Sequence, residues 1–113
     1  MAPLLDQNAE RFKALGHPVR LGILRLVVQG HPEGTPAGAI QAAIGVPAST
    51  LSHHLACLAD TGLVAVERDG TTLRYRAQFE ALHLLMDYLW EDCCKGGRSG
   101  PVSPARTDCC PAR

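Results

Sequence analysis

The chain has 113 residues, of which 46% are hydrophobic, and its 11 lysines and arginines balance its 11 aspartates and glutamates. This length supports one domain with its own core and is too short for two. The zero net charge argues against a protein that coats polyanions with its whole surface, but it is compatible with a local basic stripe.

Membrane attachment and export are not expected. No apolar run approaches the roughly 18 residues that cross a bilayer, and the N-terminus has no basic segment followed by an apolar one. We therefore expect a cytoplasmic protein without membrane contact, whose five cysteines are mostly reduced. Because five is an odd number, a closed disulfide framework is not expected either.

Two helices are predicted in the first 30 residues. Residues 4–15 have apolar side chains at helical spacing, and Gly16 ends the pattern. These apolar side chains are Leu5, Ala9, Phe12 and Leu15. Pro18 suits the first turn of a second helix, which ends at Gly30 and is apolar nearly all round. A helix of that kind belongs in the centre of a domain.

Two further helices are predicted before residue 62. Thr35 as N-cap and Pro36 as first helical residue predict a short helix that ends at Gly45. The next helix covers about residues 48–60 and ends at Gly62. Its buried stripe consists of Leu51, Leu55 and Leu58. Two helices joined by a tight turn in this way have the layout of a helix-turn-helix.

The periodicity changes after residue 62. Residues 63–77 alternate between apolar and polar side chains, as strands do, and contain the Asp69-Gly70 pair that marks hairpin turns. A hairpin directly behind a helix-turn-helix supplies a wing. The predicted fold class is therefore mainly α with a small β-hairpin, a winged helix-turn-helix with the element order α-α-α-α-β-β-α.

The last helix is predicted to run from Phe79 to Cys94. Its apolar residues recur at alternating spacings of three and four, which is typical of a seam that packs on another helix, here one from a second subunit. The seam consists of Phe79, Leu82, Met86, Leu89 and Cys93. Residues 96–113 are rich in glycine, proline and serine and predict a flexible tail, so we divide the chain into a domain at 1–95 and a tail at 96–113.

The helix over residues 48–60 carries candidates for reading DNA. With the leucine stripe buried, its compact hydrogen-bonding side chains point outwards and suit phosphates or base edges in a major groove. On the hairpin, three arginines around Tyr75 carry the charge that a DNA backbone attracts. A merely solvated surface is the alternative for both features. The predicted DNA-binding residues are Ser49, Thr50, Ser52, His53, Arg68, Arg74 and Arg76.

Three segments carry a family resemblance: ALGHPVRLGILRLV, AAIGVPASTLSHHLACLADTGLV and ERDGTTLRYRA. Over about residues 9–90 the chain resembles the ArsR/SmtB family of winged-helix, metal-responsive repressors. The resemblance implies a homodimer, joined through its first and last helices, that binds operator DNA and represses its own operon until a metal ion binds. Basic residues that members often carry late in the recognition helix are replaced here by alanines, so phosphate anchoring is expected from Arg20, the wing arginines and helix N-termini. His54 and Cys57 are predicted to pack in the interior.

Four of the five cysteines form two adjacent pairs near the C-terminus. Thiolates select soft metal ions, and arsenite is a small thiophilic ion that three thiolates bind as a pyramid. Fourteen residues separate Cys94 from Cys109, and a flexible chain of that length spans roughly 20 Å, so the second pair can reach the first. By resemblance to arsenite-responsive members, whose thiols sit at the end of the last helix, we expect As(III) or Sb(III) as inducer and no catalytic cofactor. The predicted ligands are Cys93, Cys94, Cys109 and Cys110.

Other uses of these cysteines stay open. Four thiolates suit zinc, cadmium or copper(I) in a sensor of the same fold, oxidation of the pairs would make a redox switch, and metal sequestration is a further alternative. His83, Asp87 and Glu91 share one face of the last helix, which is predicted to be a solvated surface rather than a remnant zinc site. An enzyme is not expected, because the acidic residues of EDCCKGG raise a thiol pKa and the sequence contains no nucleophile triad or phosphate loop.

Overall fold

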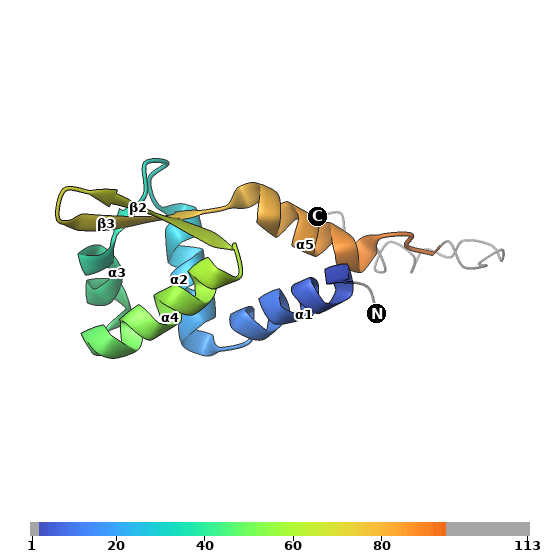
Figure 1. Cartoon of the computed structure of the whole chain (residues 1–113), viewed down its shortest axis with the longest axis horizontal. Helices are drawn as coiled ribbons and strands as arrows, with labels where there is room; N and C mark the ends of the chain where they lie inside the picture. Colours follow the sequence, from blue (N-terminus) through green and yellow to red (C-terminus); the bar gives the residue numbers. More distant parts are fainter. Residues whose placement is uncertain (1–2, 95–113) are drawn as a thin grey trace.

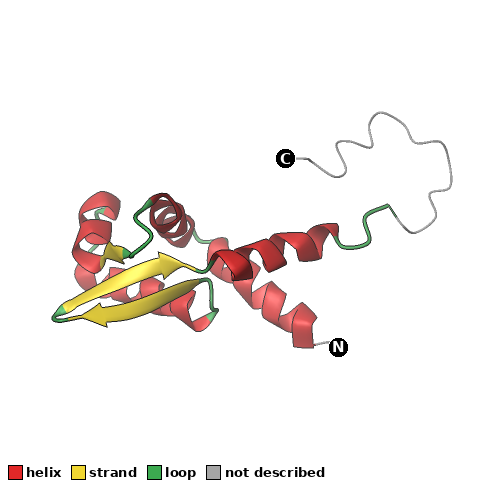
Figure 2. Ribbon diagram, turned by 90° about the horizontal axis from the view of Figure 1, so that it is seen from above, coloured by secondary structure: helices red, strands yellow, loops and turns green. Residues whose placement is uncertain are grey.

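The computed structural model describes residues 3–94, so the predicted tail with Cys109 and Cys110 lies outside the described residues. The predicted winged helix-turn-helix, mainly helical with a small hairpin, is confirmed (Figures 1 and 2). Its elements are α1 (Pro3–Leu15), α2 (Pro18–Gln29), β1 (Thr35–Pro36), α3 (Ala37–Ile44), α4 (Ala48–Asp60), β2 (Val64–Asp69), β3 (Thr72–Ala77) and α5 (Phe79–Trp90). None of the helices among the described residues has the length and apolar character needed to span a membrane.

Helix α2 lies at the centre of the domain, as its apolar composition predicts. It packs against α1, α3, α4 and β3 and buries Ile23, Leu24 and Val27. His17 caps its N-terminus, because the imidazole Nδ1 accepts a hydrogen bond from the Val19 N–H at 3.1 Å. The core around α2 is completed by the predicted leucine stripe of α4 and by residues of the sheet. Its main members are Ile40, Leu51, Leu55, Leu58, Leu63, Val64, Tyr75, Ala77 and Leu85.

Thr35 and Pro36 form a short edge strand, so their predicted place at the start of a helix is wrong. In β1, Thr35 is opposite Tyr75 and Pro36 is opposite Arg74, in antiparallel register with β3. The sheet order is β1-β3-β2, which puts β1 at an edge. An edge position tolerates a proline because its missing N–H deprives no further strand of a hydrogen bond. Helix α3 consequently begins at Ala37.

The hairpin of β2 and β3 confirms the predicted wing, with the turn displaced by one residue. Asp69 pairs with Thr72 as the last residue of β2, so Gly70 and Thr71 form the two-residue connection. Gly70 has a φ of 67°, a left-handed conformation that glycine adopts without steric cost. The tight connection fixes the register along the whole hairpin, from Val64 opposite Ala77 to the turn.

Helix α5 ends at Trp90, four residues before the predicted end at Cys94. Its last turn has no basic residue, and Glu91 and Asp92 follow directly. Negative charge opposes the helix macrodipole at a C-terminus, which explains the early end. Cys93 and Cys94 therefore lie in a turned segment after the helix, where Cys94 has a positive φ of 60°.

The outer helices α1 and α5 lie together at the end of the molecule away from the wing (Figures 1 and 2). In α5 the residue buried inside the chain is Leu85, whereas most of the predicted seam is exposed. The exposed fractions are 54% for Phe79, 41% for Met86 and 57% for Leu89. In α1, Asn8 and Ala14 are buried, while Leu4 and Leu5 are 52% and 40% exposed. Contiguous apolar exposure of this kind marks an interaction surface.

Candidate nucleic-acid interface

Helix α4 presents a polar face to solvent, as predicted, and its bounds agree with the predicted range 48–60. Its buried side consists of Leu51, His54, Leu55 and Leu58. The opposite side carries four predicted DNA contacts, all of which are exposed: Ser49, Thr50, Ser52 and His53. At 100° per residue these side chains project away from the core. They are therefore placed where a helix in a major groove presents hydrogen-bonding groups.

The turn before α4 sets the angle between the two helices of the motif. Gly45 ends α3 with a φ of 82°, and its N–H donates to the Gln41 carbonyl at 2.8 Å. The Gln41 side chain in turn donates to the Val46 carbonyl at 3.3 Å. Helix α4 then starts after Pro47, with no side-chain hydrogen bond capping its first turn. The first N–H groups of α4 are thus available to an anion such as a DNA phosphate.

His54 packs in the interior, as predicted, and engages Arg20. The Arg20 guanidinium donates through Nε to the Ala14 carbonyl at 2.7 Å, and its Nη1 lies 3.2 Å from Nδ1 of His54. Burial lowers the pKa of His54 below its usual 6.5, and His17, Arg20 and His53 lower it further. Arg20 is half-buried and its guanidinium contacts Ala14 and His54, so its use as a phosphate anchor stays a prediction.

Two of the three predicted wing arginines pair with carboxylates of the neighbouring strand. Arg74 Nε lies 3.3 Å from Asp69 Oδ2, and Arg76 Nη2 lies 3.5 Å from Glu67 Oε1. In the antiparallel register each pair is diagonal on one face of the hairpin, so the residues are within reach of one another. Three arginines and two carboxylates leave the hairpin with a formal charge of only +1.

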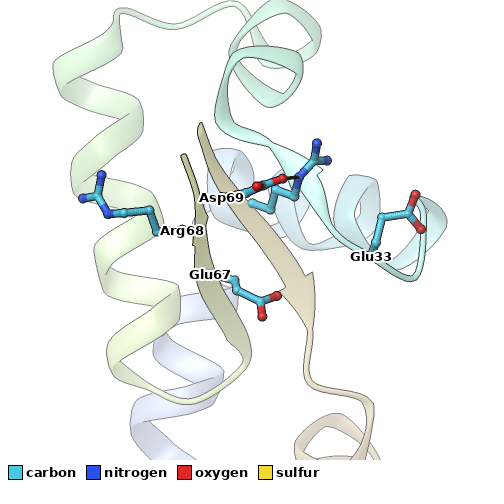
Figure 3. Close-up of a pocket in the computed structure, with 5 residues that line it drawn as sticks. Glu33, Glu67, Arg68 and Asp69 are labelled. Atoms are coloured by element: carbon cyan, nitrogen blue, oxygen red, sulfur yellow. Dashed lines mark hydrogen bonds and ion pairs between the residues drawn. The ribbon is translucent and has the colours of Figure 1, made fainter. Parts of the chain in front are cut away.

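Arg68 has a different environment. It alternates along β2 with Glu67 and Asp69, and its side chain extends toward the α4 side of the hairpin, away from both carboxylates (Figure 3). The pocket drawn there has a volume of about 380 Å³ and is lined by Glu33, Glu67, Arg68, Asp69 and Arg74. Among the side chains drawn, Arg74 lies with the three carboxylates while Arg68 points to the other side, so this pocket is unsuited to an anion. Arg68 is therefore the wing arginine best placed to meet a phosphate beside α4.

The remaining predicted residues take structural positions. Tyr75, which the sequence places among the wing arginines, is 8% exposed and belongs to the core; burial raises its pKa. Cys57 is partly buried and packs on the core, as predicted. Sequence reasoning missed Arg11, whose Nε donates to the Thr61 carbonyl at the end of α4 at 2.8 Å. No local pattern signals this bond, because 50 residues separate its partners.

Cys93 and Cys94 lie side by side after α5, with their sulfur atoms 3.3 Å apart. Within residues 3–94, no three histidine, cysteine or acidic side chains gather closely enough to hold a metal ion. This applies to His83 and Asp87 of α5 and to Glu91 directly after it, which are all exposed. Of the four predicted ligands, the described residues thus bring together two.

A helix-turn-helix with an exposed polar second helix and a β-hairpin behind it defines the winged-helix class of DNA-binding domains. Residues 15–67 match the family model for a helix-turn-helix domain. The HTH-type transcriptional regulator YgaV of Escherichia coli is 37% identical over 89 residues, which cover 79% of this chain and 88% of that protein. The chain is also similar in structure to a homodimeric winged helix-turn-helix DNA-binding domain of Mycobacterium bovis, which is called a possible ArsR-family transcriptional regulator. The two are 34% identical with a TM-score of 0.63, and the match covers 87% of this chain and 91% of that one.

The probable mercury resistance operon repressor of Streptomyces lividans is 41% identical over 70 residues, or 62% of this chain. The match spans only 54% of that repressor's length. On these similarities the chain belongs to the ArsR-like family of winged helix-turn-helix transcriptional regulators. It is a regulator of the DNA-binding type and not an enzyme, as the sequence predicts.

We expect Arg68→Ala to weaken binding to operator and random DNA about equally. Removing one arginine–phosphate interaction should reduce the slope of log K against log salt by about 0.9. Arg74→Ala and Arg76→Ala should have the same uniform effect but a smaller one, because these arginines must first leave Asp69 and Glu67. Fluorescence anisotropy at several salt concentrations measures both slopes. Asp69→Asn is the matched control: it releases Arg74 and should raise affinity. If Arg68→Ala affected the operator alone, Arg68 would contact bases instead.

Proposed function

We propose that the protein is a homodimeric transcriptional repressor that binds operator DNA through α4 and the wing and releases it when a soft metal ion binds its C-terminal cysteines. The observation that carries the DNA-binding part is the outward polar face of α4. Ser49, Ser52 and His53 stand on a helix fixed from behind by a buried leucine stripe. Such a rigid, exposed helix enters a major groove, while Arg68 and the N-terminus of α4 bind flanking phosphates.

The exposed apolar residues of α1 and α5 support the proposed homodimer. A pocket of about 500 Å³ between these helices is lined by Leu4, Asn8, Arg11, Leu84 and Tyr88, among others. Next to it the seam of α5 exposes Phe79, Met86 and Leu89. The homodimeric state of the Mycobacterium bovis domain supports the same assembly. A two-fold dimer then places two α4 helices on successive half-sites of one DNA duplex.

For the inducer we propose arsenite or antimonite. The neighbouring sulfur atoms of Cys93 and Cys94 supply two soft donors in the reduced protein, and one of the two tail cysteines, Cys109 or Cys110, supplies the third. The site adjoins α5 and hence the proposed dimer interface. Metal binding would shift the protein towards a dimer geometry with lower affinity for DNA, by its differential affinity for the two states.

Mercury(II) is a second candidate inducer. The similarity to a probable mercury resistance operon repressor favours it. A thiophilic ion that accepts two-coordinate thiolate binding also needs fewer ligands than arsenite, so Cys93 and Cys94 alone can hold it.

One gel-shift experiment tests the proposal. The reduced full-length protein is bound to the promoter of its own gene and titrated with arsenite, antimonite, mercury(II), zinc and cadmium. We expect a specific complex that arsenite or antimonite dissociates at the lowest concentration. Release by mercury alone selects the second candidate, and release by zinc or cadmium alone contradicts both. A protein that shifts promoter and random DNA equally would not be an operator-binding repressor.

A further inference from the structure

Two arginines connect the outer helix α1 to the recognition helix. Arg11, in α1, donates to the Thr61 carbonyl at the C-terminus of α4. Arg20, in α2, bridges the Ala14 carbonyl near the end of α1 and the ring of His54 in the middle of α4. In addition to the buried leucine stripe, these two arginines hold the recognition helix by hydrogen bonds, and only the second bond has a titratable acceptor.

The contact with Arg20 fixes the protonation state of His54. A guanidinium has donors and no acceptor, so Nδ1 of His54 must be unprotonated and accept, which leaves the ring proton on Nε2. His54 is only 7% exposed, so water cannot readily replace Arg20 as a partner. A His54 ring protonated at both nitrogens has no acceptor to offer. The bond then breaks, and two cations face each other inside the fold.

The surroundings of His54 also oppose its protonation. The His17 ring from the N-terminus of α2 lies 4.5 Å from it, centroid to centroid, and His53 of α4 lies at 5.7 Å. His17, His53 and Arg20 are the charged or titratable groups that act on His54, and each is positive when charged. His17 additionally accepts from the Val19 N–H through its own Nδ1, which fixes its ring beside that of His54.

We propose that Arg20 and His54 are positioning residues for DNA reading. Their hydrogen bond holds α4 in the operator-binding orientation only while His54 is neutral, so acidification lowers the discrimination between operator and random DNA. This inference rests on the proposed operator binding. The adjacent residue His53 and the neighbouring Ser52 are the proposed base contacts, so a small rotation of α4 is enough to misplace them.

The test compares discrimination at two pH values. The probe is a duplex that the wild-type protein selects from a random pool, and the reference is a scrambled duplex of the same length. The ratio of the two affinities cancels the contribution of phosphate contacts, which both duplexes share. We expect the wild-type ratio to fall about five- to tenfold between pH about 7.5 and about 5, because His54 in the folded protein takes up a proton only as the pH falls below its lowered pKa.

The informative variant is His54→Asn. The asparagine Oδ1 takes the place of Nδ1 and accepts from Arg20, but it does not titrate. Its ratio should stay nearly constant over this pH range. Arg11→Gln is the matched control, because it weakens the other hydrogen bond to α4. The acceptor of that bond is the Thr61 carbonyl, which does not titrate. This variant should lower the ratio at every pH and keep the wild-type pH slope.

A His54→Asn protein with the wild-type slope overturns the proposal. An independent measurement on the wild type is the ¹⁵N chemical shift of the His54 ring at neutral pH, which should show Nε2 protonated and Nδ1 bare. A ring protonated at Nδ1 overturns the proposal even where the variant fails to fold. If the wild-type protein binds all duplexes equally at every pH, the proposed operator binding is wrong. The tautomer measurement then still decides whether the Arg20–His54 hydrogen bond exists.

Discussion

Replacing Met86 and Leu89 together by lysine is expected to convert the protein into a monomer that no longer holds its operator. Both side chains are largely exposed on the seam of α5 and would be buried in the proposed dimer. Each buried ammonium costs several kcal/mol in desolvation, and the two-fold symmetry doubles the number of ammonium groups buried in the interface. A monomer retains one half-site, so operator affinity should fall by about 100-fold or more, as the linkage of two half-sites is lost.

Because the new residues are lysines, a loss of DNA binding can be attributed to the loss of the dimer. A positive charge does not repel DNA, so a loss of binding cannot be attributed to electrostatics. Glu80→Lys is the matched control, because Glu80 lies on the opposite side of α5 from Leu89 at 100° per residue. Light scattering after size exclusion gives the mass, and anisotropy gives the operator affinity. A double variant that remains dimeric, or a monomer with full operator affinity, contradicts the proposed dimer.

The recognition helix can be predicted from the sequence to the residue. Its leucine stripe at positions 51, 55 and 58 dictates which face is buried, and the angle of 100° per residue then dictates which side chains point outwards. The wing is equally well defined, because alternation and an Asp-Gly pair are both local signals. His54 is predictable for the same reason, as it lies on the buried flank of the stripe.

The errors arise where distant residues decide the local structure. Thr35 and Pro36 carry a good helix start signal, yet pairing with β3 converts them to a strand. In the same way, no local pattern signals the contact of Arg20 with His54, because 34 residues separate them. The pairing of Arg74 and Arg76 with carboxylates can be predicted from the sequence, because the hairpin register places Glu67 and Asp69 on the same face as both arginines.

Replacing both Cys93 and Cys94 by serine is expected to leave repression intact and abolish release by arsenite. Serine is similar in size, and the two positions follow α5, far along the chain from α4, so the fold and the operator affinity should survive. A hydroxyl cannot replace a thiolate on a soft ion. Operator release should therefore be absent even at about 100 times the arsenite concentration that frees the wild type, as measured by anisotropy in the presence of a reductant.

Variants of the other cysteines separate the inducer site from a general thiol effect. Cys57→Ala is the control within the recognition helix; its side chain packs on the core, so release by arsenite should be unchanged. If Cys109 and Cys110 are alternative third ligands, as proposed, each single serine variant should respond almost normally and the double variant should need much more arsenite. Because a ligand shifts the DNA-bound population only by its differential affinity for two states, removal of metal ligands must impair release and leave repression unchanged. Release of the Cys93→Ser/Cys94→Ser protein at wild-type arsenite concentrations would place the sensor elsewhere in the chain.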